Sequence, residues 1–469
     1  MNLLSLYTVL FFASYVTSIS FLTPPSQDPF YRAPPNLEHY APGEIIRMRP
    51  PPNRFSSFYF PFEVQRAWQV LLRSSDSFGR PTHVVTTIIQ PFNADPSKVL
   101  SYQTFEDSSH LDCATSYGMQ HGARPGTVIT QAEVPLMVPA LRSGYYLVVP
   151  DFEGPQAAYG AGRQFAHAVL DSIRAALQSG SVTGIEETAR VGMIGYSGGA
   201  FAGSWAVAMQ AEYAPEITGN LVGAALGGFV TNITSVAEAN DGTIVAGLVP
   251  MQFNGLCNEY PEFKERLLEL MADDRTRTWW TRHSQRCFIP LQIASVFRNF
   301  FTGKRRVFPD GFGIFNDPII GRVTSDNSLI NLDSTHLPQV PIFIYHCFLD
   351  RIVPIKDPRG IFDKWCAWGI ESCEFAEDLL SGHLVGIVPG TAAAMTWLAA
   401  RFDGVVPPVL GCQYTKRLLN CLYPNVSSAL LNYFGGIYDA LVGAELGPDV
   451  RSDRISVGGV LGALERLVG

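Results

Sequence analysis

The sequence predicts an α/β fold: a doubly wound sheet with a largely helical insertion. Short apolar runs alternate with helix-forming stretches along most of the chain, which is typical of a sheet covered by helices on both faces. This alternation stops over residues 230–339, and the break predicts an insertion of different architecture. The chain has 469 residues, of which 47% are hydrophobic and 16% charged, and this suits one large globular domain carrying such an insertion.

Six segments have the length and the apolar, β-favouring residues of buried strands. They are 83–90, 98–105, 145–150, 191–196, 221–226 and 341–347. A shorter strand-like segment follows at 373–376. Between the third and fourth strands an amphipathic helix is predicted by an apolar stripe at helical spacing. The stripe consists of Phe165, Val169, Ile173, Ala176 and Leu177.

These patterns divide the chain into five parts. Residues 1–20 form an apolar leader, and a proline-rich arm opens the first part of the core, 21–229. The insertion, 230–339, is interpreted as a cap or lid, and 340–411 complete the core. Residues 412–469 form a C-terminal flap or tail, which ends in apolar residues at helical spacing.

The fourth strand runs into Gly195-Tyr-Ser-Gly-Gly199, which matches the G-x-S-x-G turn that presents a nucleophilic serine. This turn is sharp, so glycines must flank the serine where a Cβ would clash. The N–H of Gly198 then points at the developing oxyanion. Because a strand precedes the turn and a helix follows it, Ser197 is favoured as a nucleophile over a solvated serine. The sequence therefore predicts an α/β-hydrolase fold and acyl-transfer chemistry.

The acid and the base should follow the serine in the order Asp or Glu, then His. Asp350 lies just past the end of the sixth strand, and His383 is the only histidine after it. His346 is the rival base, but its place inside an apolar strand predicts a buried histidine of the core. We therefore expect Ser197 to attack an acyl carbonyl, His383 to transfer its proton and Asp350 to orient the imidazole.

A second oxyanion donor is expected in the loop after the second strand, Glu106-Asp-Ser-Ser109. The residues alone assign the donor to this loop and to no single member of it, since the chain lacks a His-Gly-Gly-Gly motif. Glu106 and Asp107 could also form a metal cluster with His110 and Asp112, but a solvated or oxyanion loop explains them better. We predict no metal site and no cofactor.

Several sequence blocks, in the right order, resemble the fungal secretory lipases over about residues 90–412. The blocks are Ser101-Tyr-Gln-Thr-Phe-Glu-Asp107, Val149-Pro-Asp-Phe-Glu-Gly154, Leu170-Asp-Ser-Ile-Arg174, Gly195-Tyr-Ser-Gly-Gly199 with Trp205-Ala-Val207, Glu212-Tyr-Ala-Pro215, Leu221-Val-Gly-Ala224 and Asp350-Arg-Ile-Val-Pro354. The resemblance implies an α/β-hydrolase fold with Asp350 and His383 as acid and base. It also implies that Asp107 helps to form the oxyanion hole. The side chain can donate there only when protonated, which requires a raised pKa; otherwise only its backbone N–H serves.

Eight cysteines in an exported chain suggest disulfides. The resemblance implies the pairs Cys113–Cys287 and Cys366–Cys412, of which the first would tether the insertion to the core. Four cysteines are left over: Cys257, Cys347, Cys373 and Cys421. Of these, Cys347 lies in the sixth strand and is expected to be a buried free thiol.

The N-terminus predicts export. Residues 3–16 are mostly apolar and uncharged, and small residues follow them, so we expect a signal peptide cleaved near residue 20 and a secreted protein. No Lys or Arg precedes Arg32, which keeps an uncleaved anchor as the alternative. In an exported chain the sequons at Asn232 and Asn425 could carry glycans.

The net charge of −8 and the pI near 5.6 argue against a nucleic-acid partner, and no obligate protein partner is evident. The basic run 304–306 is better explained as a solvated loop than as a contact with anionic lipid. The insertion is expected to select the acyl chain, although most of its aromatic residues should form its own core.

The resemblance implies a triacylglycerol lipase that acts on esters or lipids at an oil–water interface. The alternative is a short-chain esterase or deacetylase of an acylated small molecule, such as a sesquiterpenoid toxin, because fold and catalytic residues would be the same. A binding protein without catalysis is a third possibility, against which the complete Ser-Asp-His set argues.

Overall fold

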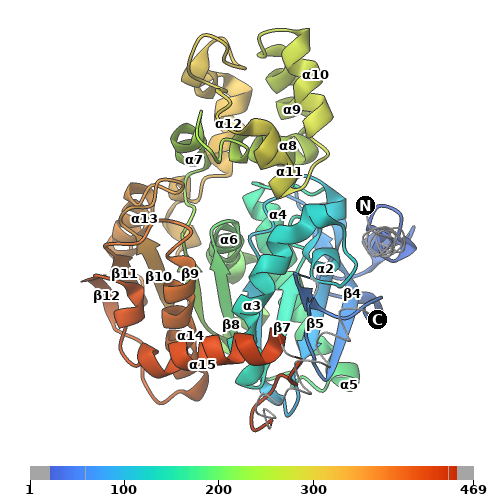
Figure 1. The fold of residues 1–469 in the computed structure, drawn as a ribbon, viewed down its shortest axis with the longest axis vertical. Coiled ribbons are helices and arrows are strands. Elements are labelled where there is room, and N and C mark those ends of the chain that lie inside the picture. Colours follow the sequence, from blue (N-terminus) through green and yellow to red (C-terminus); the bar gives the residue numbers. More distant parts are fainter. Residues whose placement is uncertain (1–21, 59, 442, 451–469) are drawn as a thin grey trace, which may run out of the picture.

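The computed structural model describes residues 22–58, 60–441 and 443–450 (Figure 1). The predicted signal peptide and the last part of the predicted tail lie outside the described residues. No described helix combines the length and the hydropathy that a membrane-spanning segment needs.

A mixed sheet of ten strands forms the centre of the core. Its strands are β1 (Ile45–Arg49), β4 (Arg66–Ser75), β5 (Pro81–Gln90), β6 (Asp95–Gln103), β7 (Tyr145–Pro150), β8 (Arg190–Tyr196), β9 (Leu221–Gly227), β10 (Ile342–Cys347), β11 (Ser372–Asp378) and β12 (Gly411–Arg417). Their order is β1-β4-β5-β7-β6-β8-β9-β10-β11-β12. The seven strands from β7 to β12 in this order are parallel, whereas β1, β4 and β5 pair antiparallel. A separate small sheet pairs β2 (Ser56–Ser57) with β3 (Phe60–Pro61).

The six predicted strands correspond to β5 to β10, and the segment 373–376 lies in β11. The sequence did not predict β1, β4 or β12. The edge strands β1 and β12 are partly exposed along their length. Their sequences therefore contain polar residues and lack the long apolar run that predicts a buried strand. Residues 411–417, which the sequence interpretation divided between the core and the C-terminal segment, form the edge strand β12.

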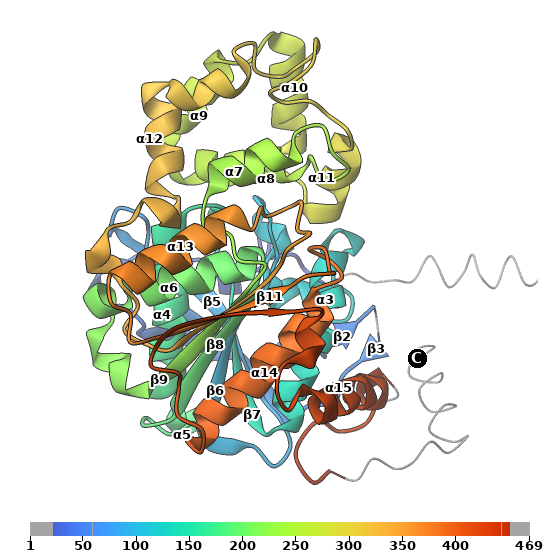
Figure 2. The same ribbon diagram turned by 90° about the vertical axis from the view of Figure 1, so that its left-hand side faces the viewer.

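Helices cover both faces of the sheet (Figure 2). One face carries α4 (Gly162–Gln178), α6 (Gly198–Tyr213) and α13 (Lys356–Ala367), and the other carries α3 (Val128–Arg142), α14 (Ile387–Asp403) and α15 (Val426–Leu441). The strands alternate between the two resulting cores: Tyr146 and Val148 pack in the first, and Tyr145 and Leu147 in the second. The amphipathic stripe predicted for 165–177 is confirmed, because it lies in α4 and is buried in the first core.

The described part of the predicted C-terminal flap contains most of β12 and the helix α15. Helix α15 packs against α3 and α14 at the end of the molecule opposite to the insertion (Figures 1 and 2).

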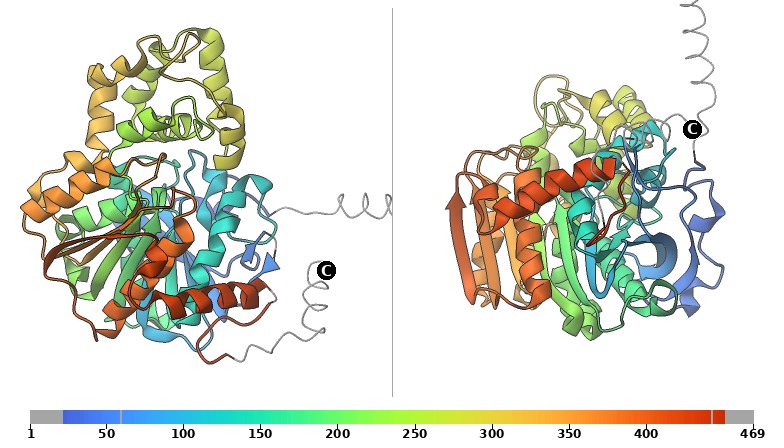
Figure 3. Two further views of the ribbon diagram at one scale, coloured as in Figure 1. Left: turned by 60° about the vertical axis from the view of Figure 1, so that its left-hand side comes forward. Right: turned by 60° about the horizontal axis from the view of Figure 1, so that its bottom comes forward.

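The insertion forms a helical layer that leaves the sheet after β9 and returns to it at β10 (Figures 1 and 3). Its helices are α7 (Ile233–Asn240), α8 (Leu248–Glu259), α9 (Pro261–Glu269), α10 (Asp274–His283), α11 (Phe288–Ser295) and α12 (Pro318–Asp326). Many of its aromatic residues form its own core, as predicted: Phe253 is only 1% exposed and lies within 6.4 Å, between ring centres, of five other rings.

Replacing Phe253 by Ala is expected to destabilise the insertion rather than change substrate preference directly. The substitution leaves a cavity among packed rings, and such a loss costs about 3–5 kcal/mol of the free energy of unfolding. Chemical denaturation measures this loss. The matched control is Ile244→Ala, whose side chain is 64% exposed and whose loss should cost less than about 1 kcal/mol. Equal losses in the two variants would contradict the packing argument.

Candidate active site

Ser197 lies at the sharp turn between β8 and α6, with φ at 52° and ψ at −119°. A positive φ at a non-glycine residue costs of order 1–3 kcal/mol, and the flanking glycines make it possible. A Cβ on Gly195 would lie 2.4 Å from the backbone of Gly199, and a Cβ on Gly199 would lie 2.0 Å from the carbonyl oxygen of Gln103. Both positions therefore require glycine, as the motif predicts.

The structure brings together the three residues that chain order predicts. His383 Nδ1 lies 2.6 Å from Asp350 Oδ2, and His383 Nε2 lies 3.0 Å from Ser197 Oγ. An ionised carboxylate can only accept, so Nδ1 carries the proton and Nε2 accepts from the serine hydroxyl. The imidazole is thus held in the tautomer that a general base needs.

The carboxylate of Asp350 is fixed by its own loop. Its Oδ1 accepts hydrogen bonds from the N–H groups of Ile352 at 2.9 Å and Val353 at 2.8 Å. Burial acts to raise the pKa of Asp350, but His383, His346 and the Val353 N–H together outweigh it and lower that pKa. The group therefore stays ionised as a partner for imidazolium.

The rival histidine, His346, is a buried residue whose two nitrogens both have partners. Its Nδ1 accepts from the N–H of Phe229 at 3.1 Å, and its Nε2 donates to the carbonyl of Val353 at 3.0 Å. Burial lowers its pKa, which agrees with a neutral ring. Nε2 also lies 3.4 Å from Asp350 Oδ2, so His346 contacts the acid from behind and not the serine.

Two neighbours of His383 were missed in the sequence. The hydroxyl of Tyr196, the residue before the serine, donates to the carbonyl of His383 at 2.6 Å. A Cβ on Gly228, where φ is +50°, would lie 2.9 Å from His383 Cε1. Tyr196 is a variable position of the motif and Gly228 lies beyond the predicted strand, so no sequence pattern singles out either.

Asp107 lies beside the nucleophile, with φ at 45°. A Cβ on Gly198 would lie 1.8 Å from Asp107 Oδ1, so this oxygen is close to the backbone of the residue after the serine. Oδ1 is buried and has no hydrogen-bond partner among the described residues. Burial raises the pKa of Asp107 to about 7, although Tyr159 and His383 act to lower it. This is the direction that a donating carboxyl group requires.

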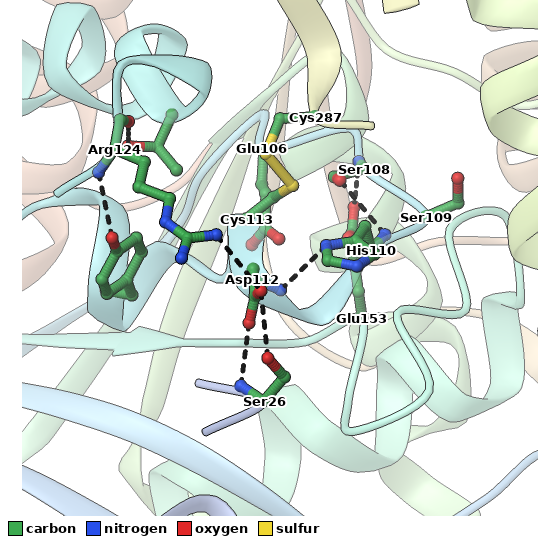
Figure 4. Close-up of a disulfide and its surroundings, with 12 residues drawn as sticks. Ser26, Glu106, Ser108, Ser109, His110, Asp112, Cys113, Arg124, Glu153 and Cys287 are labelled. Carbon is green, nitrogen blue, oxygen red and sulfur yellow. Dashed lines mark hydrogen bonds and ion pairs between the residues drawn. A yellow bond between two sulfur atoms is a disulfide. The ribbon is translucent and has the colours of Figure 1, made fainter. Parts of the chain in front are cut away.

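Buried carboxyl groups hold the loop around Asp107 in place, and two of them, Glu106 and Glu153, are drawn in Figure 4. Glu133 accepts from the N–H of Phe105 and Glu153 from the N–H of Ser108, both at 2.9 Å. Glu106 accepts from the N–H and the hydroxyl of Thr115, at 3.0 and 2.9 Å. Burial raises the pKa of Glu106 to about 8 and those of Glu133 and Glu153 well above their usual range.

The residues considered as a metal cluster have other partners. Asp112 accepts from the N–H and the hydroxyl of Ser26, and His110 Nδ1 accepts from the N–H of Asp112 (Figure 4). Within the part of the chain that the structure describes, no group of three or more His, Cys, Asp or Glu residues is arranged to hold a metal ion.

The disulfides Cys113–Cys287 and Cys366–Cys412 are the two pairs that the resemblance implies. The first joins the segment after β6 to the insertion just before α11 (Figure 4). Near it, Asn258 of α8 donates to the carbonyls of Ser109 and Ala157, both at 3.1 Å. The insertion is therefore anchored next to the loop that carries Asp107.

The four other cysteines, Cys257, Cys347, Cys373 and Cys421, are free thiols, and Cys347 is buried as predicted. Of the two sequons, Asn425 is exposed, whereas the side chain of Asn232 accepts from two N–H groups at the start of α7.

Comparison with known proteins gives consistent matches. A family model described as secretory lipase matches residues 119–409. Lipase 2 of Candida albicans is 48% identical over 452 residues, which are 96% of this chain and 97% of that protein. Lipase A of Arthroderma benhamiae is 35% identical, over 92% of this chain and 91% of that protein. Among solved structures, the closed state of Candida antarctica lipase A matches with a TM-score of 0.78 and 25% identity, over 92% of this chain and 100% of that chain.

Proposed function

Because this chain belongs to the secretory lipase family and is a carboxylic ester hydrolase, we propose that it is a secreted triacylglycerol lipase with Ser197, His383 and Asp350 as its catalytic triad. The observation that carries the proposal is the chain of contacts from Asp350 Oδ2 through the imidazole to Ser197 Oγ, at 2.6 and 3.0 Å. The named relatives are lipases, which favours this function over the deacetylase alternative.

The reaction follows from the proton positions. Ser197 Oγ attacks the ester carbonyl carbon while His383 Nε2 takes the hydroxyl proton. The tetrahedral intermediate collapses as its bond to the alcohol oxygen breaks, and His383 gives the proton to that oxygen. A water molecule then attacks the acyl-enzyme by the same route and releases the fatty acid, which restores Ser197. Asp350 stabilises the imidazolium that forms in each half of the reaction.

The oxyanion of each tetrahedral intermediate is proposed to bind the N–H of Gly198 and the protonated carboxyl group of Asp107. The support is the position of Asp107 Oδ1 next to Gly198 and the lack of a hydrogen-bond partner for this oxygen among the described residues. Each such donor is worth about 10²–10³-fold in kcat.

This assignment predicts a pH dependence. Asp107 can donate only below its pKa of about 7, so kcat/KM should fall as the pH rises through that value. Asp107→Asn carries an amide N–H₂ that donates at every pH, so its alkaline fall should disappear. Asp107→Ala should lose about 10²–10³-fold in kcat at acid and neutral pH. Initial rates on a soluble ester over a range of pH measure all three.

If Asp107→Asn keeps the alkaline fall of the unmodified protein, the side chain is not the titrating donor. In that case only the backbone N–H of Asp107 would serve the oxyanion.

The insertion is proposed to act as a cap that sets acyl-chain preference and supplies no catalytic group.

The choice between a lipase and a short-chain esterase is tested by a hydrolysis profile on esters from acetate to stearate, measured as soluble monomers and at an oil–water interface. A lipase should prefer the long esters and the interface. A strict preference for acetate with no gain at an interface would instead support a short-chain esterase.

A further inference from the structure

The insertion contains a strongly basic segment in an acidic protein. Residues 275–306 include eight Lys or Arg residues and no Asp or Glu, whereas the whole chain has a net charge of −8. The eight are Arg275, Arg277, Arg282, Arg286, Arg298, Lys304, Arg305 and Arg306. As a sequence, the run 304–306 is best explained as a solvated loop; the fold gives it neighbours that the sequence does not reveal.

The segment folds back onto one turn, 241–244, and forms a continuous surface with it. The N–H of Phe297 donates to the backbone carbonyl of Thr243 at 2.9 Å, and the N–H of Gly242 donates to the backbone carbonyl of Arg298 at 3.1 Å. The carboxylate of Asp241 accepts from three N–H groups, at residues 300–302. We call the surface formed by 241–244 and 275–306 the basic face.

Helix α10 joins the same face through a cation–π contact. The guanidinium of Arg298 lies 3.7 Å from the ring centre of Trp279, and its pKa is lowered by burial and by the nearby Arg275. Two cations are thus held close together.

Most charges of the basic face are not neutralised. Arg277 pairs with Asp274 at 2.9 Å, and Arg306 bonds to backbone carbonyls. The other basic side chains form no ion pair with any carboxylate of the described residues; they are Arg275, Arg282, Arg286, Arg298, Lys304 and Arg305. Of these, Arg275, Arg282, Lys304 and Arg305 are exposed.

Large apolar side chains are exposed among these charges. Ile244 and Phe297 are each 64% exposed, Ile293 is 71% exposed and Val296 is 45% exposed. Phe297 has φ at 55°, an unfavourable conformation for a bulky residue, and yet its ring gains no burial from it. Exposed apolar groups on the same segment as unpaired cations are the pattern of a surface that binds anionic lipid.

The basic face is connected to the catalytic residues. Asn240, next to the turn 241–244, donates to the carbonyl of Ile352 at 2.9 Å, and the N–H of Ile352 donates to Asp350. Beside the triad, Leu384 and Val385 follow His383 directly and are 68% and 71% exposed. Exposed apolar residues therefore occur both on the basic face and in the loop of the base.

We propose that the basic face binds oil surfaces that carry fatty-acid anions, and that it is therefore recruited by the product of its own reaction. The inference rests on the proposed lipase function, because ester cleavage leaves a carboxylate amphiphile at the surface of the droplet. An acidic protein is repelled by such a surface everywhere except at a cationic face. Exposed cations then add electrostatic attraction, and the apolar side chains enter the oil.

Binding is measured by flotation of Ser197→Ala protein with triolein droplets, with and without oleate, at about pH 8, well above the ordinary pKa of a carboxyl group. We expect oleate to increase the bound fraction and added salt to reduce this gain. The double variant Lys304→Glu with Arg305→Glu should lose about thirty-fold in partition onto oleate droplets. The matched control, Arg32→Glu with Arg66→Glu, makes the same charge change at exposed residues outside the insertion and should change partition less than about twofold.

A second variant tests the apolar part without a charge change. Phe297→Asn suits the positive φ at that position, so it should fold normally and still lose binding to droplets. With Ser197 restored, both variants should hydrolyse a soluble ester at the unmodified rate. Progress curves on triolein should show a lag that added oleate removes in the unmodified protein and leaves in the double variant.

Equal binding to plain and oleate-containing droplets would overturn the proposal. So would unchanged binding of the double variant, or binding to phosphatidylglycerol vesicles without binding to oleate droplets. None of these results depends on the identity of the nucleophile, because that is tested separately by hydrolysis of the soluble ester.

Discussion

The Ser197→Ala variant is expected to lose ester hydrolysis almost completely, by about 10⁴-fold or more in kcat. The nucleophilic oxygen is removed, so no acyl-enzyme can form, and His383 cannot replace that function because the triad acts as a unit. The expectation rests on the 3.0 Å contact of Ser197 Oγ with His383 Nε2 and on the strained turn that presents the serine. Initial rates on a soluble ester, with active-site titration, measure the loss.

The fold of this variant should be intact. Alanine removes only the hydroxyl group, and the positive φ of the turn is held by the close packing of Gly195 and Gly199 around it. The expected control result is an unfolding midpoint at or slightly above that of the unmodified protein, because polar groups at active sites are often kept at a cost in stability. A folded variant that retained more than about a tenth of the activity would exclude Ser197 as the nucleophile.

Much of the fold was accessible from the sequence because local patterns encode it. Buried parallel strands such as β7 and β10 are buried along their whole length and mostly apolar, and a helix packed on a sheet shows a single apolar stripe, as α4 does. The edge strand β12 was missed because one side of an edge strand faces solvent, and its residues are largely polar.

In the candidate site, too, local sequence patterns predict some residues and leave others unpredicted. Ser197, Asp350 and His383 follow from a local motif and from chain order, which fixes the positions at which strand-end loops meet. Asp107 and Gly198 lie close together but are distant in sequence, and no pattern encodes their contact. His346 and Asp350 are close in sequence, but no pattern shows that His346 approaches the acid from the side opposite to His383. The resemblance to a family supplied Asp107, which the residues alone placed only within a loop.

The basic face illustrates a third case. Its charges are visible in the sequence, but their meaning depends on which carboxylates fold against them. Asp241 lies close to the segment, and yet its oxygens accept from backbone N–H groups and from Thr302 instead of from a guanidinium. Only the fold shows that most of these cations form no ion pair with a carboxylate of the described residues, although exposed apolar side chains lie on the same segment.

Asp350→Asn and His383→Ala are expected to lose about 10⁴-fold in kcat, whereas His346→Gln should lose about tenfold or less. An amide in place of the carboxylate cannot hold the proton on His383 Nδ1, so the wrong tautomer faces the serine. His346 instead donates to Val353 at 3.0 Å and reaches Asp350 only at 3.4 Å, behind the 2.6 Å contact that His383 makes.

The effect of replacing a triad residue differs from the effect of replacing His346 in the free energy of unfolding as well as in kcat. Removing the His346 ring leaves the buried N–H of Phe229 without its acceptor, which costs about 1–3 kcal/mol of the free energy of unfolding, whereas Asp350→Asn mainly changes the chemistry. Denaturant unfolding and single-turnover rates on the same preparations give both quantities. If His346→Gln folds normally and yet is as inactive as His383→Ala, the base has been assigned to the wrong histidine. His346 contacts only the acid, Asp350. Its substitution therefore cannot abolish the contribution of the whole triad while the contact between His383 and Ser197 persists.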